Sequence, residues 1–156
     1  MGFFFLTSIK ICHYKKLLIY LADHRRKLVY IPLLIYWLII FILTTLPAGD
    51  LPDVSSLSDK TKHFLAYMML AVLLNLAFIF QTRLPKVSKY SHFFTFICAA
   101  LYGIIDELHQ SFIPGRQSDI KDWYADISGS LLGILLVFVI KKITEWGKNL
   151  SREETF

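Results

Sequence analysis

The sequence predicts an all-α integral membrane protein, a bundle of four transmembrane helices preceded by an N-terminal interfacial segment. Two features of the composition support this: 55% of the 156 residues are hydrophobic, and only 19% are charged, compared with about 25% in typical soluble domains. The third observation is the distribution of the apolar residues, which form long runs separated by short charged connectors. Runs of this length cross the hydrocarbon core of a bilayer, about 30 Å thick, as helices.

A basic and aromatic segment, residues 1–27, precedes the first apolar run. Six Lys and Arg residues are interspersed there with aromatic and aliphatic residues. Such a mixture is typical of a helix that lies in the membrane interface with its basic side chains toward lipid headgroups. A partly ordered tail accounts for the segment equally well, and both interpretations stay open.

Four membrane spans follow, and they are predicted at residues 28–46, 63–81, 92–112 and 123–140. Pro32 lies near the start of the first span, where its missing amide proton costs little. Ser58 or Asp59 can cap the second span, and Pro114 with Gly115 predicts a turn after the third. The spans define a membrane domain at residues 28–142, and residues 143–156 are expected to form a solvated tail.

The Lys and Arg residues are unevenly divided between the two ends of the spans. Thirteen lie in the N-terminal segment, between the second and third spans, or after the fourth span, and the other two loops hold Lys60, Lys62, Arg116 and Lys121. This bias predicts that both termini are cytoplasmic and that the two acidic loops are outside. It also explains the net charge of +5 without a nucleic-acid partner, so the expected partner is the lipid bilayer.

Three polar blocks fall at the predicted outer ends of the second, third and fourth spans. Their members are Asp59, Lys60, His63 and Tyr67 in the first block, Asp106, Glu107, Gln110 and Arg116 in the second, and Asp119, Asp122 and Asp126 in the third. Helical spacing places the first and third blocks each on or near one stripe of a helix. The third stripe continues as Gly129 and Gly133, whose spacing lets membrane helices approach closely. These acids are therefore expected to face other helices.

Some members of these blocks lie deeper in the predicted membrane spans than others, and burial is more costly for the deeper ones. A carboxylate within the bilayer costs about 3 kcal/mol on insertion scales, so we expect Asp106 to have a buried partner or a function, and Glu107 and Asp126 share this argument. Asp59 fits a helix N-cap as well as a site, and Lys60 fits a side chain that extends to the interface.

The other outer residues also have simpler explanations. Tyr67 suits an aromatic belt or ordinary packing, and His63 alone is a weak signal. Arg116 and Asp119 could form a solvated ion pair that contributes little to stability.

Taken together, the blocks offer two kinds of chemistry. A carboxylate beside a histidine can act as an acid/base pair, and the candidate catalytic residues are Asp59, His63, Asp106 and Glu107. The candidate ligand-binding residues are Lys60, Tyr67, Gln110, Arg116, Asp119, Asp122 and Asp126. Several carboxylates with a histidine could also hold a divalent metal, and this stays open; no other cofactor is expected. No spacing fixes a reaction, so the sequence leaves open whether the protein is an enzyme.

At these residues the sequence resembles the VanZ-like family of small bacterial membrane proteins. The matching pattern runs from Asp59-Lys60-x-x-His63-x-x-x-Tyr67, through Asp106-Glu107-x-x-Gln110-x-Phe112-x-Pro114-Gly115-Arg116, to Asp119-x-x-Asp122-x-x-x-Asp126-x-x-Gly129-x-x-x-Gly133. The resemblance covers about residues 30–140. The family pattern carries Asn where this chain has Asp126, so a role carried over to that position is not implied. The family takes its name from a protein associated with teicoplanin resistance, which implies a place in the bacterial inner membrane and a link to the cell envelope.

Two functional hypotheses follow. In the first, an outward-facing polar pocket binds or modifies an anionic envelope component, such as a lipid-linked cell-wall precursor, with Lys60 and Arg116 on its anionic groups. Asp119 and Asp122 would then position Arg116 or a metal, and His63 would exchange protons with Asp59 or Asp106. In the second, the protein is a non-catalytic structural or accessory subunit whose polar cluster only locks the helices together.

A proton-coupled transporter is a weaker third hypothesis. Asn75 is expected to hydrogen-bond across helices, and no other polar residue was expected to continue a path from the outer cluster toward the cytoplasm. The oligomeric state is not indicated by the sequence.

Overall fold

The computed structural model describes residue 16 and residues 19–50 and 57–153, and these residues form helices joined by short loops, with no strand among them. The elements in order are the π-helix η1 (Arg26–Tyr30), α2 (Ile31–Thr45), the 3-10 turn η2 (Ala48–Asp50), α3 (Asp59–Phe80), α4 (Pro85–Lys89), α5 (Ser91–Gln110) and α6 (Ile120–Glu153). Four helical stretches are long and apolar enough to cross a membrane, at Arg26–Thr45, Asp59–Phe80, Ser91–Gln110 and Ile120–Glu145. The predicted all-α class with four spans is confirmed.

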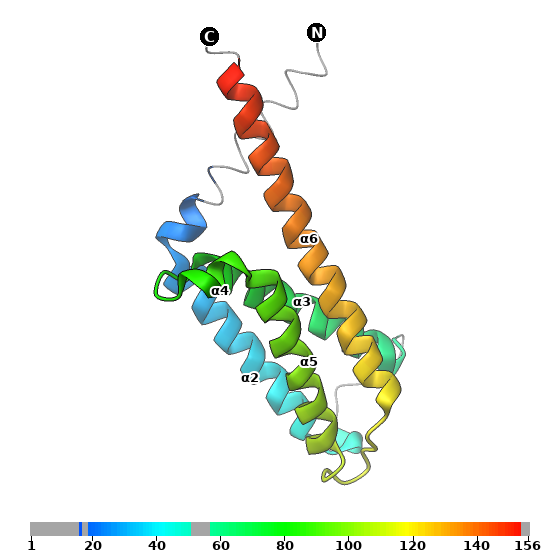
Figure 1. Ribbon diagram of the computed structural model, residues 1–156. Coiled ribbons are helices and arrows are strands. Elements are labelled where there is room, and N and C mark those ends of the chain that lie inside the picture. Colours follow the sequence, from blue (N-terminus) through cyan, green and yellow to red (C-terminus); the bar gives the residue numbers. More distant parts are fainter. Residues whose placement is uncertain (1–15, 17–18, 51–56, 154–156) are drawn as a thin grey trace.

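Two helices extend beyond the spans predicted from hydropathy, α3 at its start and α6 at its end. α3 begins at Asp59 because the Ser58 side chain accepts a hydrogen bond from the Thr61 amide at 3.2 Å, which makes Ser58 the N-cap. At the other end of the chain, α6 continues past Ile140 to Glu153, so most of the predicted tail is helical. Figure 1 shows this part of α6 extending beyond the other helices.

The predicted interfacial segment lies mostly outside the described residues. Residues 19–23 are helical and lead into η1, which continues without interruption into α2. Residues 1–15 and 17–18, and with them most of this prediction, lie outside the described part of the chain.

The closest helix pair is α3 with α6, and glycines make that approach possible. A Cβ atom at Gly129 would overlap the backbone carbonyl of Phe64, and one at Gly133 would overlap the carbonyl of Met68. Because any side chain at these positions would push the backbones apart, the glycines allow the contact. The predicted packing of the Gly129–Gly133 stripe against another helix is confirmed.

The side chains are distributed as expected for a protein surrounded by lipid. Large apolar residues such as Leu34, Leu38 and Phe41 are about half exposed, while the buried set includes Asn75, Thr95 and several acids. A soluble bundle would bury its apolar stripe and expose its polar face. This inverted arrangement keeps the charges inside the bundle, where they can pair with one another.

Side-chain hydrogen bonds to backbone carbonyls fix the helices at the end of the bundle where the polar blocks lie. Tyr36 on α2 donates to the carbonyl of Ala66 on α3 at 3.0 Å, and Trp123 Nε1 on α6 donates to the carbonyl of Ala100 on α5 at 3.1 Å. Figure 1 shows the C-terminal ends of α2 and α5 at the same end of the bundle as the start of α6. The predicted turn follows α5, and Gly115 in it has a φ of 76°, a conformation that favours glycine.

Toward the other end of the bundle, one expectation is confirmed and one is wrong. The side-chain amide of buried Asn75 on α3 hydrogen-bonds His92 Nδ1 on α5 at 2.8 Å, which is the expected contact across helices. The bundle interior also contains the buried hydroxyls of Thr95 and Ser130. Asn75 is therefore not the only buried polar residue away from the polar blocks, contrary to the sequence-based expectation, because Thr95 and Ser130 lie within apolar runs that do not indicate which face is buried.

Candidate functional site

The third polar block forms an ion-pair cluster with Lys60. The ammonium of Lys60 on α3 lies 3.1 Å from Asp119 Oδ2 and 3.0 Å from Asp122 Oδ1, the latter carboxylate being 8% exposed. Asp119 and Asp122 were expected to position Arg116 or a metal; in the structure they hold Lys60 and not Arg116, and the metal alternative stays a prediction. Lys60 is thereby neutralised by protein carboxylates, and it is less suited to contact an anionic ligand than the sequence indicated.

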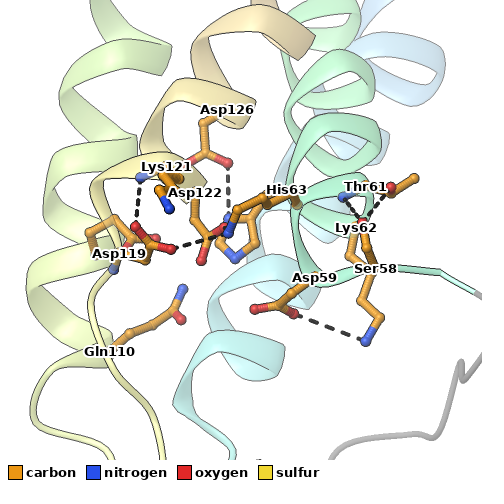
Figure 2. A network of polar contacts seen from close by, with 12 residues as sticks. Ser58, Asp59, Thr61, Lys62, His63, Gln110, Asp119, Lys121, Asp122 and Asp126 are labelled. Carbon is orange, nitrogen blue, oxygen red and sulfur yellow. Dashed lines mark hydrogen bonds and ion pairs between the residues drawn. The ribbon is translucent and has the colours of Figure 1, made fainter.

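A buried histidine–carboxylate pair lies one turn deeper. His63 Nδ1 on α3 is 3.0 Å from Asp126 Oδ1 on α6, and Asp126 is fully buried. Figure 2 shows the two side chains facing each other between their helices. The hydrogen-bonding partner of His63 is therefore Asp126, and not Asp59 or Asp106 as proposed from the sequence. A carboxylate that accepts from one imidazole nitrogen fixes the ring orientation and leaves the other nitrogen for a ligand or a proton.

Asp106 and Glu107, adjacent at the end of α5, are both buried and have different hydrogen-bond partners. Asp106, 3% exposed, has Tyr67 Oη at 3.5 Å and Gln110 Nε2 at 3.4 Å, and both contacts are long for hydrogen bonds. Glu107 Oε2 accepts a 2.8 Å hydrogen bond from the Asp119 backbone amide. No lysine or arginine of the described residues forms an ion pair with either acid. The burial expected from the depth of the two acids is confirmed, and their role in a site stays a prediction.

A cavity of about 240 Å³ lies beside Asp106. Its walls come from α2, α3, α5 and the loop before α6, and they consist of Ile40, Leu43, Thr44, Asp59, Lys62, His63, Ala66, Tyr67, Asp106, Gln110 and Arg116. Part of the wall is apolar, and its polar side chains come from the first and second blocks together with Thr44 and Lys62. The cavity thus brings together six of the residues predicted from the sequence, while Lys60, Glu107, Asp119, Asp122 and Asp126 lie outside its lining.

Arg116 reaches the cavity from the α5–α6 loop and is anchored on α2. Its guanidinium donates to the carbonyl of Leu43 at 2.8 Å and to that of Leu46 at 3.4 Å, and its Nη1 lies 3.4 Å from Gln110 Oε1. These partners are neutral, so the positive charge of Arg116 is not cancelled by a carboxylate within the described residues. Of the two cations proposed for an anionic ligand, Arg116 is the one that lines the cavity.

Sequence reasoning missed Lys62, Thr44 and Gly103. Lys62 was counted only as a charge in a loop, but it lines the cavity, and its ammonium lies 4.0 Å from the carboxylate of exposed Asp59. Thr44 is a buried polar residue within the first apolar run. Its hydroxyl group in that run was the one feature from which the sequence could have indicated a polar role. Gly103 carried no signal, because it is isolated in the third span.

The outermost acid is electrostatically stabilised in its charged form. The pKa of Asp119 is lowered from its ordinary value, first by the hydrogen bond from the Lys121 backbone amide and then by the Lys60 ammonium. Deeper in the site, four buried carboxylates (Asp106, Glu107, Asp122 and Asp126) share one ion-pairing lysine and one histidine. The interior of the site therefore has an excess of acids.

In the part of the chain that the structure describes, two groups of residues are close enough to hold a metal ion, and both contain His63. They are Asp59 with His63 and Asp122, and His63 with Glu107 and Asp126; within each group the candidate ligand atoms lie within 4.8 Å of one another. Chemically, then, the site can hold an anion at Arg116 and Lys62, exchange protons at His63 or Asp106, or bind a cation among its acids.

Comparison with known proteins gives one match. The family model described as VanZ/LLP1 matches residues 28–141, a stretch that includes most of each of the four membrane spans and every residue of the site. Searches among curated proteins and among solved structures gave no match.

Proposed function

The chain belongs to the VanZ/LLP1 family, and from this membership and the geometry of the site we propose that it binds or modifies an anionic component of the bacterial cell envelope. The ligand class is a lipid-linked phosphate or another acidic cell-wall precursor, and the cavity is the binding site. In this proposal the protein lies in the inner membrane with the cavity toward the outer side and both termini in the cytoplasm. A contribution to teicoplanin tolerance is the phenotype that accompanies this function.

The observation that supports the proposal most is the composition of the cavity wall. Lys62 and Arg116 offer positive charge at its polar side, and the guanidinium of Arg116 suits a phosphate or carboxylate in two-point contact. Ile40 and Leu43 form an apolar side suited to an acyl or prenyl chain. Buried Asp106 and His63 also line this space, where they can accept or donate a proton if a reaction takes place.

A thermal-shift measurement on the purified protein in detergent tests this proposal. A polyprenyl phosphate should raise the melting temperature of the wild-type protein, and the uncharged polyprenol of the same chain length should raise it much less. Arg116→Gln and Lys62→Gln should each lower the affinity for the phosphate about tenfold or more, since each removes a charge that contacts the ligand. Lys86→Gln, at the opposite end of the bundle, is the matched control. Equal shifts for phosphate and alcohol, or unchanged affinity in both variants, would rule out the anion site.

The second candidate function, a lock that only joins the helices, is favoured by a specific observation of its own. The pairs Lys60–Asp122 and His63–Asp126 both connect α3 with α6 and could serve packing alone. A lock predicts that substitutions in the site reduce the amount of folded protein. A binding site predicts that activity is lost at unchanged abundance.

A further inference from the structure

We propose that His63, Glu107 and Asp126 together bind one divalent transition-metal cation, such as Zn²⁺ or Mn²⁺. Each residue comes from a different helix (α3, α5 and α6), and all three are buried. Their candidate ligand atoms lie within 4.8 Å of one another. Ligands about 2.1 Å from Zn²⁺ are roughly 3.4 Å apart in tetrahedral geometry, so modest side-chain rotation closes the set around an ion.

Unsatisfied oxygen atoms point to a missing ligand. Glu107 Oε1 and Asp126 Oδ2 are buried and have no hydrogen-bond partner among the described residues. Glu107 Oε2 is held by the Asp119 amide, and Asp126 Oδ1 lies 3.0 Å from His63 Nδ1, so that an ion bound by this nitrogen and by Asp126 would replace the proton between them. Buried polar atoms are nearly always paired, and metal-binding carboxylates are commonly held by one oxygen while the other binds the ion.

Space beside one of these oxygens depends on a glycine. A Cβ atom at Gly103 on α5 would lie 3.1 Å from Asp126 Oδ2 and 3.0 Å from Trp123 Cδ1. Gly103 and Glu107 are four residues apart, so they lie on the same face of α5. A side chain at Gly103 would therefore crowd the free Asp126 oxygen, and glycine avoids this.

Charge distinguishes this group from the outer one. Asp122 is already paired with Lys60 at 3.0 Å, and exposed Asp59 lies 4.0 Å from Lys62. Glu107 and Asp126 have no lysine or arginine within ion-pairing distance in the described structure, so a doubly charged ion would balance both carboxylates with His63 neutral. One imidazole nitrogen with two carboxylate oxygens favours Zn²⁺ or Mn²⁺ over Mg²⁺ and Ca²⁺, which prefer oxygen ligands alone.

Zinc titration of the purified full-length protein tests the site. After treatment with a chelator and dialysis in detergent, wild-type protein should bind about one equivalent of Zn²⁺ by calorimetry, and elemental analysis should find it retained after desalting. Glu107→Gln and Asp126→Asn preserve side-chain size, and each should weaken Zn²⁺ binding by at least tenfold. Asp59→Asn should bind as the wild type does. Failure of the wild-type protein to bind Zn²⁺ above the level of Glu107→Gln would overturn the proposal, as would a loss confined to Asp59→Asn.

A second readout does not depend on the buried carboxylate variants folding. Co²⁺ in place of Zn²⁺ should give visible absorption bands in the wild-type protein, and Gly103→Ala should reduce them because its methyl group approaches Asp126 Oδ2. Helical circular dichroism establishes that each variant is folded. Wild-type protein that shows no such bands on saturation with Co²⁺ would contradict the site. Neither the zinc titration nor the cobalt spectrum uses an envelope ligand. Both results are therefore independent of the anion-binding proposal.

Discussion

Asp119 and Lys60 show how the outermost charges of the site act. Asp119 accepts from the Lys121 amide, receives Lys60 at 3.1 Å, and its own amide donates to Glu107 at 2.8 Å. The residue therefore connects the start of α6 to both α3 and α5. Its side chain is 40% exposed, so solvent screens the pair, and the electrostatic contribution to stability is modest.

The lowered pKa of Asp119 makes this contribution dependent on pH. A carboxyl whose pKa is lower in the folded protein than in the unfolded chain stabilises the fold above its unfolded pKa, which is about 3.9 for Asp. The stabilisation is lost as the pH falls through the folded pKa. We therefore expect Asp119→Asn to melt slightly below the wild-type protein at pH 6, and the difference to vanish in strong acid. A difference that grows as the pH falls would contradict the assigned sign.

Burial of single acids could be predicted from the sequence, but their partners could not. Asp106, Glu107 and Asp126 were expected to be buried because of their depth in the apolar runs, and they are. Which residue pairs with which depends on how each helix is rotated and on the height of its neighbour, and no residue pattern encodes this. The Asp126 position shows the limit: the family resemblance gave it no role, yet it is the partner of His63.

Helix α6 carries the clearest relation between sequence and packing. The stripe of acids and glycines could be predicted from the sequence because its members recur at helical spacing, and in the structure it faces α3. The residue at which α6 ends could not be predicted from hydropathy. Lys141 and Lys142 end the apolar run but do not end the helix, since Lys, Glu and Arg are good helix formers and neither Pro nor a terminating turn follows them.

Large side chains at the glycine positions should separate α3 from α6. Gly129→Leu and Gly133→Leu would place atoms where the backbone carbonyls of Phe64 and Met68 lie. The strain should exceed about 3 kcal/mol, the upper end of ordinary overpacking, because rigid backbone blocks relaxation. We expect little folded protein in size-exclusion chromatography of detergent extracts. Gly49→Leu is the matched control, since a Cβ there meets no atom of the described residues within 4 Å. Wild-type yields for all three variants would show that the helices are not in close contact.

Viewed as a whole, the molecule has its buried acids concentrated at one end of a mainly apolar bundle. Its fold class and the approximate positions of its four spans could be predicted, because hydropathy and helix length are properties of short segments. The cavity beside Asp106 could not, because it is formed where α2, α3, α5 and a loop meet. Lys62 was overlooked for the same reason: its role depends on a wall built by other segments.

The orientation of this asymmetric molecule is a prediction from the bias of Lys and Arg. In a background lacking Cys12 and Cys98, Ser118→Cys should react with a membrane-impermeant thiol reagent in intact cells. Thr82→Cys, in the loop between α3 and α4, should react only after permeabilisation. Both positions are exposed in the structure, so accessibility within the protein does not limit the reaction. Labelling of Thr82→Cys alone in intact cells would reverse the orientation and place the cavity toward the cytoplasm.

The most direct test of the central claim, that the polar cluster is a site and not a lock, is the effect of Asp106→Asn. The substitution keeps the size and hydrogen-bonding capacity of a side chain that is 3% exposed and lines the cavity, and it removes the charge and proton transfer. Membrane abundance, melting temperature and teicoplanin tolerance would be measured together in a sensitive host, with Glu145→Gln at the far end as control. We predict normal abundance and stability with tolerance lost. Full tolerance in the variant, or its disappearance from the membrane, would contradict the claim.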